Sequence, residues 1–169
     1  ADLVGISLCS KIGKACYIPI GHKSSKCIKK DIVIKKLKPL LEDPSVKKIG
    51  QNIKFDFIVL YKEGISISSM EDTMLMSYVL DAGKNRHNMD TLSEIHLGHK
   101  TISFKEIVGT GKKEINFSDV EIDKAKDYAA EDADVTFRLY RKFIKNLKLE
   151  KMINIYEIFE KPLIKILAF

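Results

Sequence analysis

The chain has 169 residues, of which 45% are hydrophobic and 31% are charged, and this is enough apolar material for one buried core. Its formal net charge of +6, from 29 Lys and Arg against 23 Asp and Glu, is too balanced for a disordered basic tail. No stretch approaches the roughly 18 consecutive apolar residues of a membrane span and no signal peptide begins the chain, so we expect a folded cytoplasmic domain without a membrane partner.

The first half of the chain predicts short strands alternating with helices. Alternating apolar residues bounded by turn residues predict strands at 3–8, 15–20, 46–50 and 65–67. Apolar residues at helical spacing predict helices at 31–42, 54–63 and 73–80. The turn at 11–14 contains Gly13 and joins the first two strands as a hairpin.

The second half predicts helices only. Three capping-box sequences of the form Ser/Thr-x-x-Glu begin at Thr91, Ser103 and Ser118, and they predict helices at 92–97, 104–108 and 119–146. Two segments after Glu150 also have helical patterns. Strands followed by alternating helices and a helical tail predict an α/β fold.

The positive charge is nearly all lysine, because arginine occurs only at Arg86, Arg138 and Arg141. Lysine neutralises phosphate as a point charge, whereas arginine reads base edges with its planar fork. Nucleic-acid binding by this chain would therefore act through the backbone and tolerate many sequences. Lysine doublets are equally typical of a solvated surface, so charge alone leaves both interpretations open.

One helical segment places a hydroxyl and a carboxylate side by side. Tyr128 and Asp132 are four residues apart in Tyr128-Ala-Ala-Glu-Asp132, so they project from one face of the helix. Val135 and Leu139 continue that face as apolar residues, which indicates partial burial. A carboxylate in such a place must be paired, hydrogen-bonded or bound to a cation, and a purely structural role remains the alternative.

A second segment, Gly50-Gln51-Asn52-Ile-Lys-Phe-Asp56, joins a short strand to a helix. Side chains that bind ligands commonly lie at the carboxyl end of a strand in an α/β sheet. Asp56 falls in the first helical turn, where a carboxylate also simply complements the helix dipole.

Four segments in order resemble the proofreading 3′-5′ exonuclease domain of bacterial DNA polymerase I, in the A family of polymerases. They are Gln51-Asn-Ile-Lys-Phe-Asp56, Arg86-His-Asn-Met-Asp-Thr-Leu92, Lys100-Thr-Ile-Ser-Phe104 and Tyr128-Ala-Ala-Glu-Asp-Ala-Asp134. The resemblance runs nearly end to end and implies a ribonuclease H-like mixed sheet flanked by helices.

The resemblance also implies a reaction. Two divalent ions, Mg²⁺ or Mn²⁺, would bind the terminal phosphodiester of a single-stranded DNA 3′ end, and a nucleoside 5′-monophosphate would be released. Asp132 would be a ligand of the metal that activates water and Asp56 would serve the second metal, while Tyr128 would orient the attacking water. Gln51, Asn52, Arg86 and Phe104 would line the path of the single strand, with Phe104 as a stacking surface.

The chain departs from the family in one respect. The Asp-x-Glu strand that precedes the position of Ala1 in the family is missing, and that central strand supplies two of the four acidic ligands. We expect residues 1–149 to form the exonuclease domain without its first strand, and residues 150–169 to form a helical junction leading to a polymerase domain. Both ends of the chain look clipped, and without the strand the fragment would be inactive with two exposed sheet edges.

Three functions remain open. The first is a metal-dependent 3′-5′ DNA exonuclease that proofreads for DNA polymerase I and acts as a monomer. The second is a catalytically silent domain of the same fold that binds DNA or braces the polymerase. The third is an RNA 3′ exonuclease of the wider superfamily.

Overall fold

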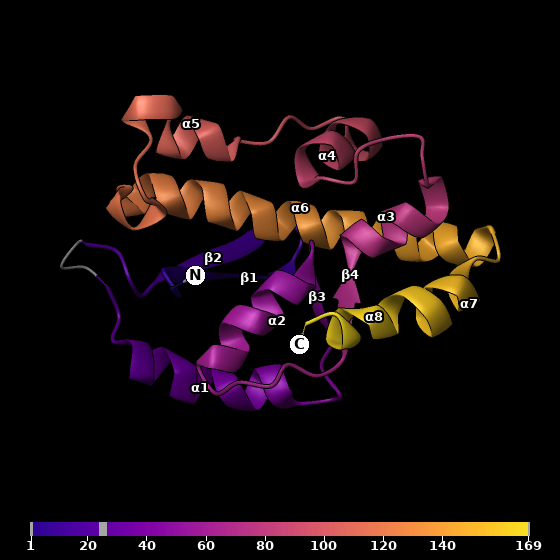
Figure 1. Ribbon diagram of the computed structural model, residues 1–169, viewed down its shortest axis with the longest axis horizontal. Helices are drawn as coiled ribbons and strands as arrows, with labels where there is room; N and C mark the ends of the chain where they lie inside the picture. Colours follow the sequence, from indigo (N-terminus) through magenta and orange to yellow (C-terminus); the bar gives the residue numbers. More distant parts are fainter. Residues whose placement is uncertain (1, 24–26, 169) are drawn as a thin grey trace.

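The computed structural model describes residues 2–23 and 27–168, so Ala1 and Phe169, on which the expectation of clipped ends rests, lie outside the described residues. The described chain is a mixed α/β fold, mostly helical, with two small sheets (Figure 1). None of its helices combines the length and the apolar composition that crossing a membrane requires.

The elements follow one another in the predicted order. The strands are β1 (Gly5–Lys11), β2 (Lys14–Pro19), β3 (Lys48–Gly50) and β4 (Met70–Asp72). The α-helices are α1 (Lys30–Glu42), α2 (Ile53–Lys62), α3 (Thr73–Asp81), α4 (Met89–Leu97), α5 (Phe104–Val108), α6 (Ile122–Leu149), α7 (Ile153–Ile155) and α8 (Lys161–Ile166). Two 3₁₀ turns, η1 (Gly111–Lys113) and η2 (Phe117–Asp119), and a π-helical turn, η3 (Tyr156–Glu160), complete the set.

The strands form two separate pairs instead of one mixed sheet. β1 and β2 pair antiparallel, with Gly5 opposite Pro19, whereas β3 and β4 pair parallel, with Gly50 opposite Asp72. From the sequence we expect a mixed sheet without its central strand, and within the described residues no strand joins β1 to β3.

Helix α6 is the element on which both sheets lie. It contacts β1, β2 and β3, and it also contacts α3, α4 and α5. Figure 1 shows it running across the molecule, with α4 and α5 on one side and α1 and α2 on the other. Its apolar side chains recur every four residues through Val135, Leu139, Phe143 and Leu147, all of them at most 2% exposed.

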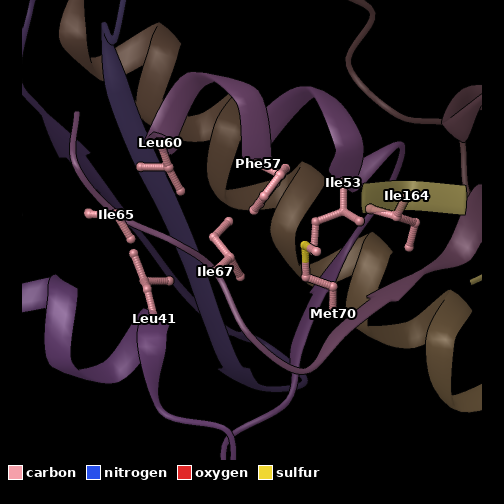
Figure 2. Close-up of a cluster of buried hydrophobic side chains, with 8 residues drawn as sticks. All are labelled: Leu41, Ile53, Phe57, Leu60, Ile65, Ile67, Met70 and Ile164. Atoms are coloured by element: carbon pink, nitrogen blue, oxygen red, sulfur yellow. The ribbon is translucent and has the colours of Figure 1, made fainter. Parts of the chain in front are cut away.

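The core has two main clusters of buried side chains. The first joins α1, α2, β4 and α8 through Leu41, Ile53, Phe57, Leu60, Ile65, Ile67, Met70 and Ile164 (Figure 2). The second gathers the apolar face of α6 with Met76, Leu92 and Tyr156. Burial of these apolar side chains is the main force that holds the helices onto the two sheets.

Most predicted elements are confirmed, and two kinds of prediction are wrong. Ile65 and Ile67 are buried in a segment without strand pairing, and the strand lies at Met70–Asp72, where β3 offers hydrogen-bonding partners. Of the three capping boxes only Ser103 with Glu106 forms. Helix α4 begins after Asn88, before Thr91, and α6 begins after Glu121, while Ser118 lies in η2.

Candidate active site

One pocket collects most of the side chains that the sequence singled out. It has a volume of about 430 Å³ and lies between β1, the end of β3, α2, α5 and α6. Six of the seven predicted site residues line it: Gln51, Asn52, Asp56, Phe104, Tyr128 and Asp132. Its other lining residues are Gly5, Ser7, Tyr17, Phe55, Phe117 and Ala129.

The α2 side of the pocket begins with a turn at Asn52. This residue has φ 57° and ψ 47°, a left-handed conformation that asparagine tolerates better than most residues. Its exposed side chain lies at the pocket, and α2 starts with the next residue. Gly50 precedes this turn, and a Cβ there would stand 2.8 Å from the Cβ of Ile53, so β3 and α2 approach too closely for a side chain.

Asp56 reaches the pocket from the first turn of α2. Asp56 is exposed in the pocket, although protein atoms surround its carboxyl group on the remaining sides. The pKa of the Asp56 carboxyl is raised to about 6, mainly by this crowding and in smaller part by the nearby carboxylate of Asp72.

Asp132 and Tyr128 face the same pocket from α6. Burial raises the pKa of the Asp132 carboxyl to about 7, against the effect of a hydrogen bond that the Tyr128 hydroxyl donates to it. The negative charges of Asp90 and Glu131 contribute to the same rise in the pKa of Asp132. Burial also raises the pKa of Tyr128, so its phenol stays protonated and acts as a donor at neutral pH. Two crowded carboxyls in one pocket favour a positively charged ligand.

Aromatic rings form one wall of the pocket. Phe104 and Phe117 stack with their centroids 6.0 Å apart, and each lies 6.0 Å from the ring of Tyr128. The ring of His22 lies against Phe117, and its Nε2 is 2.7 Å from the Tyr17 hydroxyl oxygen. Phe104 is 48% exposed, so part of its side chain is available to a ligand.

Gln51 uses both ends of its amide within the protein. Its Nε2 donates to the carbonyl of His87 at 2.7 Å, and its Oε1 accepts from the hydroxyl of Thr73. It therefore ties the segment that carries Arg86 to the end of β3. Arg86 itself is exposed and does not line the pocket, so it is the one predicted site residue that the structure leaves outside.

Glu131 holds the segment before Phe104 onto α6. Its two carboxylate oxygens accept from His99 Nε2 at 2.8 Å and from the backbone N–H of Ile102 at 2.7 Å. Asp90 accepts from the Thr101 hydroxyl at 2.7 Å in the same segment. These bonds fix the start of α5, so Phe104 has a defined place at the pocket.

The sequence did not single out Phe55, Phe117 or Tyr17. Phe55 is 56% exposed and precedes Asp56 in the first turn of α2. The signal for it in the sequence was an aromatic residue shortly after the two amides of Gln51 and Asn52. Phe117 and Tyr17 line the pocket because of how the chain folds, and no sequence motif in their own segments marks them.

The side chains present do not make a complete metal site. Within residues 2–23 and 27–168, no three His, Cys, Asp or Glu side chains come together in a way that could hold a metal ion. Asp56 and Asp132 supply two carboxylates to the pocket, whereas a pair of divalent ions needs more oxygen ligands than these provide.

Comparisons with known proteins find similar sequences. A model of a 3′-5′ exonuclease family matches residues 1–148. DNA polymerase I of Rhizobium leguminosarum is 42% identical over 189 aligned residues, which cover 99% of this chain and 18% of that protein. DNA polymerase I of Pseudomonas aeruginosa is 41% identical, with 99% and 19% covered. The chain thus spans about a fifth of the length of these curated relatives.

Solved structures show the same fold at lower identity. The POL domain of Pol1 from M. smegmatis, in complex with DNA primer-template and dNTP, superposes with a TM-score of 0.73 at 18% identity. That match covers 99% of this chain and 25% of the other. Brucella melitensis NrnC superposes with a TM-score of 0.72 at 20% identity and covers 99% and 73%.

Proposed function

The chain belongs to a family of 3′-5′ exonucleases and matches the exonuclease region of bacterial DNA polymerase I, and from this premise we propose that it serves proofreading. In this proposal it removes nucleoside 5′-monophosphates from single-stranded 3′ ends of DNA. The pocket between β1, α2 and α6 is its active site, and Asp56, Tyr128 and Asp132 are its catalytic residues.

The observation that carries the proposal is the convergence of the motif residues. Side chains from the end of β3, from α2, from α5 and from α6 line one pocket, although long stretches of chain separate them. Core residues would also be brought together by folding, but Asn52 and Asp56 are exposed and Phe104 is 48% exposed. Exposed polar and aromatic side chains around a hollow favour binding of a ligand.

The pocket suits an unpaired DNA end. Phe55 and Phe104 offer exposed rings, and base stacking on such a ring contributes about 1–3 kcal/mol per base with little sequence preference. The amide of Asn52 is free to hydrogen-bond sugar or phosphate at the pocket's edge. The protonated hydroxyl of Tyr128 lies beside Asp132, where it can orient a water molecule.

Metal binding needs groups beyond those described. The family is typically metal-dependent, and Asp56 and Asp132 would be ligands of the two divalent ions. The pocket is lined by Gly5 and Ser7 of β1 and by Gln51 just after β3, and no described strand pairs with both β1 and β3. We propose that an Asp-x-Glu strand at this place completes the ligand set and joins the two small sheets into one.

The remaining features of the proposal concern the whole protein. Residues 1–149 form the exonuclease domain and residues 150–169 lead to a polymerase domain in the same polypeptide. The partner is the single-stranded 3′ end of DNA, the domain acts as a monomer, and the protein works in the bacterial cytoplasm.

Hydrolysis by a completed domain tests the proposal. The chain is fused at its N-terminus to a strand that carries Asp-x-Glu and is given single-stranded DNA with a 5′ label. We expect stepwise shortening from the 3′ end with Mg²⁺ or Mn²⁺, and none with chelator. Asp56→Ala and Asp132→Ala should abolish shortening, whereas Asp127→Ala, an exposed aspartate beside Tyr128, should retain it. Activity that persists in the Asp56→Ala, Asp132→Ala double variant would contradict the assignment.

A silent DNA-binding domain is the second candidate, because among the described residues no three His, Cys, Asp or Glu side chains come together to hold a metal ion. It predicts salt-sensitive DNA binding without shortening in the fused protein as well.

The same assay with single-stranded RNA separates an RNA exonuclease from a DNA exonuclease, since only the former would shorten RNA faster than DNA.

A further inference from the structure

Asp72 lies behind the pocket wall, and we infer that it is a positioning residue of the site, which sets the start of α2 and is itself held by Tyr156. This inference rests on the proposed function, because it concerns how the same pocket is kept in shape. Asp72 is 1% exposed and does not line the pocket, so it would reach a bound DNA end only through other residues.

The carboxylate of Asp72 bonds the beginnings of two helices. Its Oδ1 accepts from the backbone N–H of Met74 at 2.9 Å, as the N-cap of α3. The same oxygen accepts from the N–H of Asn52 at 3.0 Å, and Oδ2 accepts from the N–H of Ile53 at 3.0 Å. A cap of α3 alone would need only the first bond. The other two go to α2, about twenty residues earlier in the chain.

These two bonds hold the start of α2, which carries Phe55 and Asp56 into the pocket. The side chain of Asn52 offers no cap to α2, so Asp72 supplies the acceptors that the first N–H groups of this helix need. Asp56 lies within the next turn, and a helix moves as a unit over so short a distance. A displacement of the α2 start therefore displaces Asp56 and Phe55 in the pocket by a similar amount.

Tyr156 connects Asp72 to the C-terminal helices. Its hydroxyl accepts from the backbone N–H of Asp72 at 3.0 Å and donates to Glu71 Oε2 at 3.0 Å. Lys161 of α8 donates to the other oxygen of Glu71 at 2.8 Å. Because Tyr156 and Glu71 are at most 1% exposed, water does not replace these bonds. The segment after residue 150 thus braces β4, and β4 braces the pocket.

The test separates positioning from simple capping. Asp72→Asn keeps an Oδ1 that can accept from Asn52 and Met74, but it turns an amide N–H₂ group toward the N–H of Ile53. We expect hydrogen exchange at the Ile53 amide to become about tenfold faster, as loss of one hydrogen bond predicts. We also expect the resonance of the Asp56 carboxyl carbon to shift and affinity for a thymidine tetranucleotide to fall about fivefold or more.

Tyr156→Phe keeps the ring in the core and removes only the hydroxyl. It should speed exchange at the Asp72 amide and weaken tetranucleotide binding in the same direction. Tyr140→Phe is the matched control, because Tyr140 belongs to the same core and its hydroxyl bonds Lys47 instead of Asp72. The control should leave exchange at Asp72 and Ile53 and the affinity unchanged.

The outcomes are distinguishable. Faster exchange at Ile53 with an unchanged Asp56 resonance and unchanged affinity would make Asp72 a cap only and overturn the inference. Unchanged exchange at Ile53 would overturn it as well. If the unaltered chain does not bind the tetranucleotide, the proposed function fails, while a shifted Asp56 resonance in Tyr156→Phe, which leaves the charge of Asp72 in place, would still support the positioning role.

Discussion

Replacing Asp132 by asparagine should stabilise the metal-free chain at pH 8. Burial raises the pKa of this carboxyl from 3.8 to about 7, so the folded state favours the protonated form. Asparagine is neutral at every pH, has nearly the same shape, and keeps an oxygen that accepts from the Tyr128 hydroxyl. The substitution therefore removes the cost of ionising a crowded group without opening a cavity.

The size of this gain in stability, and the pH range over which it appears, follow from the raised pKa of Asp132. A group whose pKa is higher in the folded state contributes stability below its unfolded pKa and loses it as pH rises through the folded pKa. Each pKa unit corresponds to about 1.4 kcal/mol, and solvent screens part of the effect at a half-buried site, so we expect a gain of about 2–4 kcal/mol. The gain is complete above about pH 7 and approaches zero near pH 4.

Urea denaturation with chelator at pH 4, 6 and 8 measures this gain. Asp134→Asn on the same helix is the control, because the Asp134 carboxylate pairs with Arg138 at 2.7 Å and accepts from the N–H of Gly13. That substitution removes favourable contacts and should not stabilise the chain at pH 8. An Asp132→Asn variant no more stable than the unaltered chain at pH 8 would refute the reasoning.

Three further predictions concern the pocket and its supports. Phe104→Ala should weaken binding of a thymidine tetranucleotide by about 1–3 kcal/mol in a titration, whereas Ile95→Ala, at another exposed apolar side chain, should not. Asn52→Ala should lower the free energy of unfolding by about 1 kcal/mol or more relative to Asn52→Gly, because only glycine adopts φ 57° without strain. Ser103→Ala should cost about 0.5–2 kcal/mol in thermal denaturation, since Ser103 forms a capping box, while Ser118→Ala should cost less than about 0.5 kcal/mol.

Local pattern predicted the order of elements because most of them carry their own signals. Helix α6 shows this, since its apolar residues repeat at helical spacing over its whole length. Local pattern failed where a partner decides the structure. Ile65 and Ile67 alternate as in a strand, yet the residues with a hydrogen-bonding neighbour are Met70–Asp72. Thr91 and Ser118 have the spacing of a capping box, but the helices beside them begin elsewhere.

Spacing and resemblance contributed different parts of the candidate site. Spacing alone placed Tyr128 and Asp132 on one helix face, and the structure has them hydrogen-bonded. It could not bring Asp56 to the same pocket, because that contact depends on how α2 and α6 pack. Phe117 and Tyr17 were missed for the same reason, and Asp72 was missed because its role lies in backbone bonds to another segment.

The most direct test of the central claim maps where a single-stranded DNA end binds. A thymidine tetranucleotide with a free 3′ hydroxyl is titrated into the isotope-labelled chain, and amide resonances are followed. We predict the largest shifts at residues 51–56, at Phe104 and at 128–132, around one pocket. Shifts confined to a second pocket, around Arg138 and Arg141 of α6, or no shifts at millimolar tetranucleotide, would contradict the proposed site.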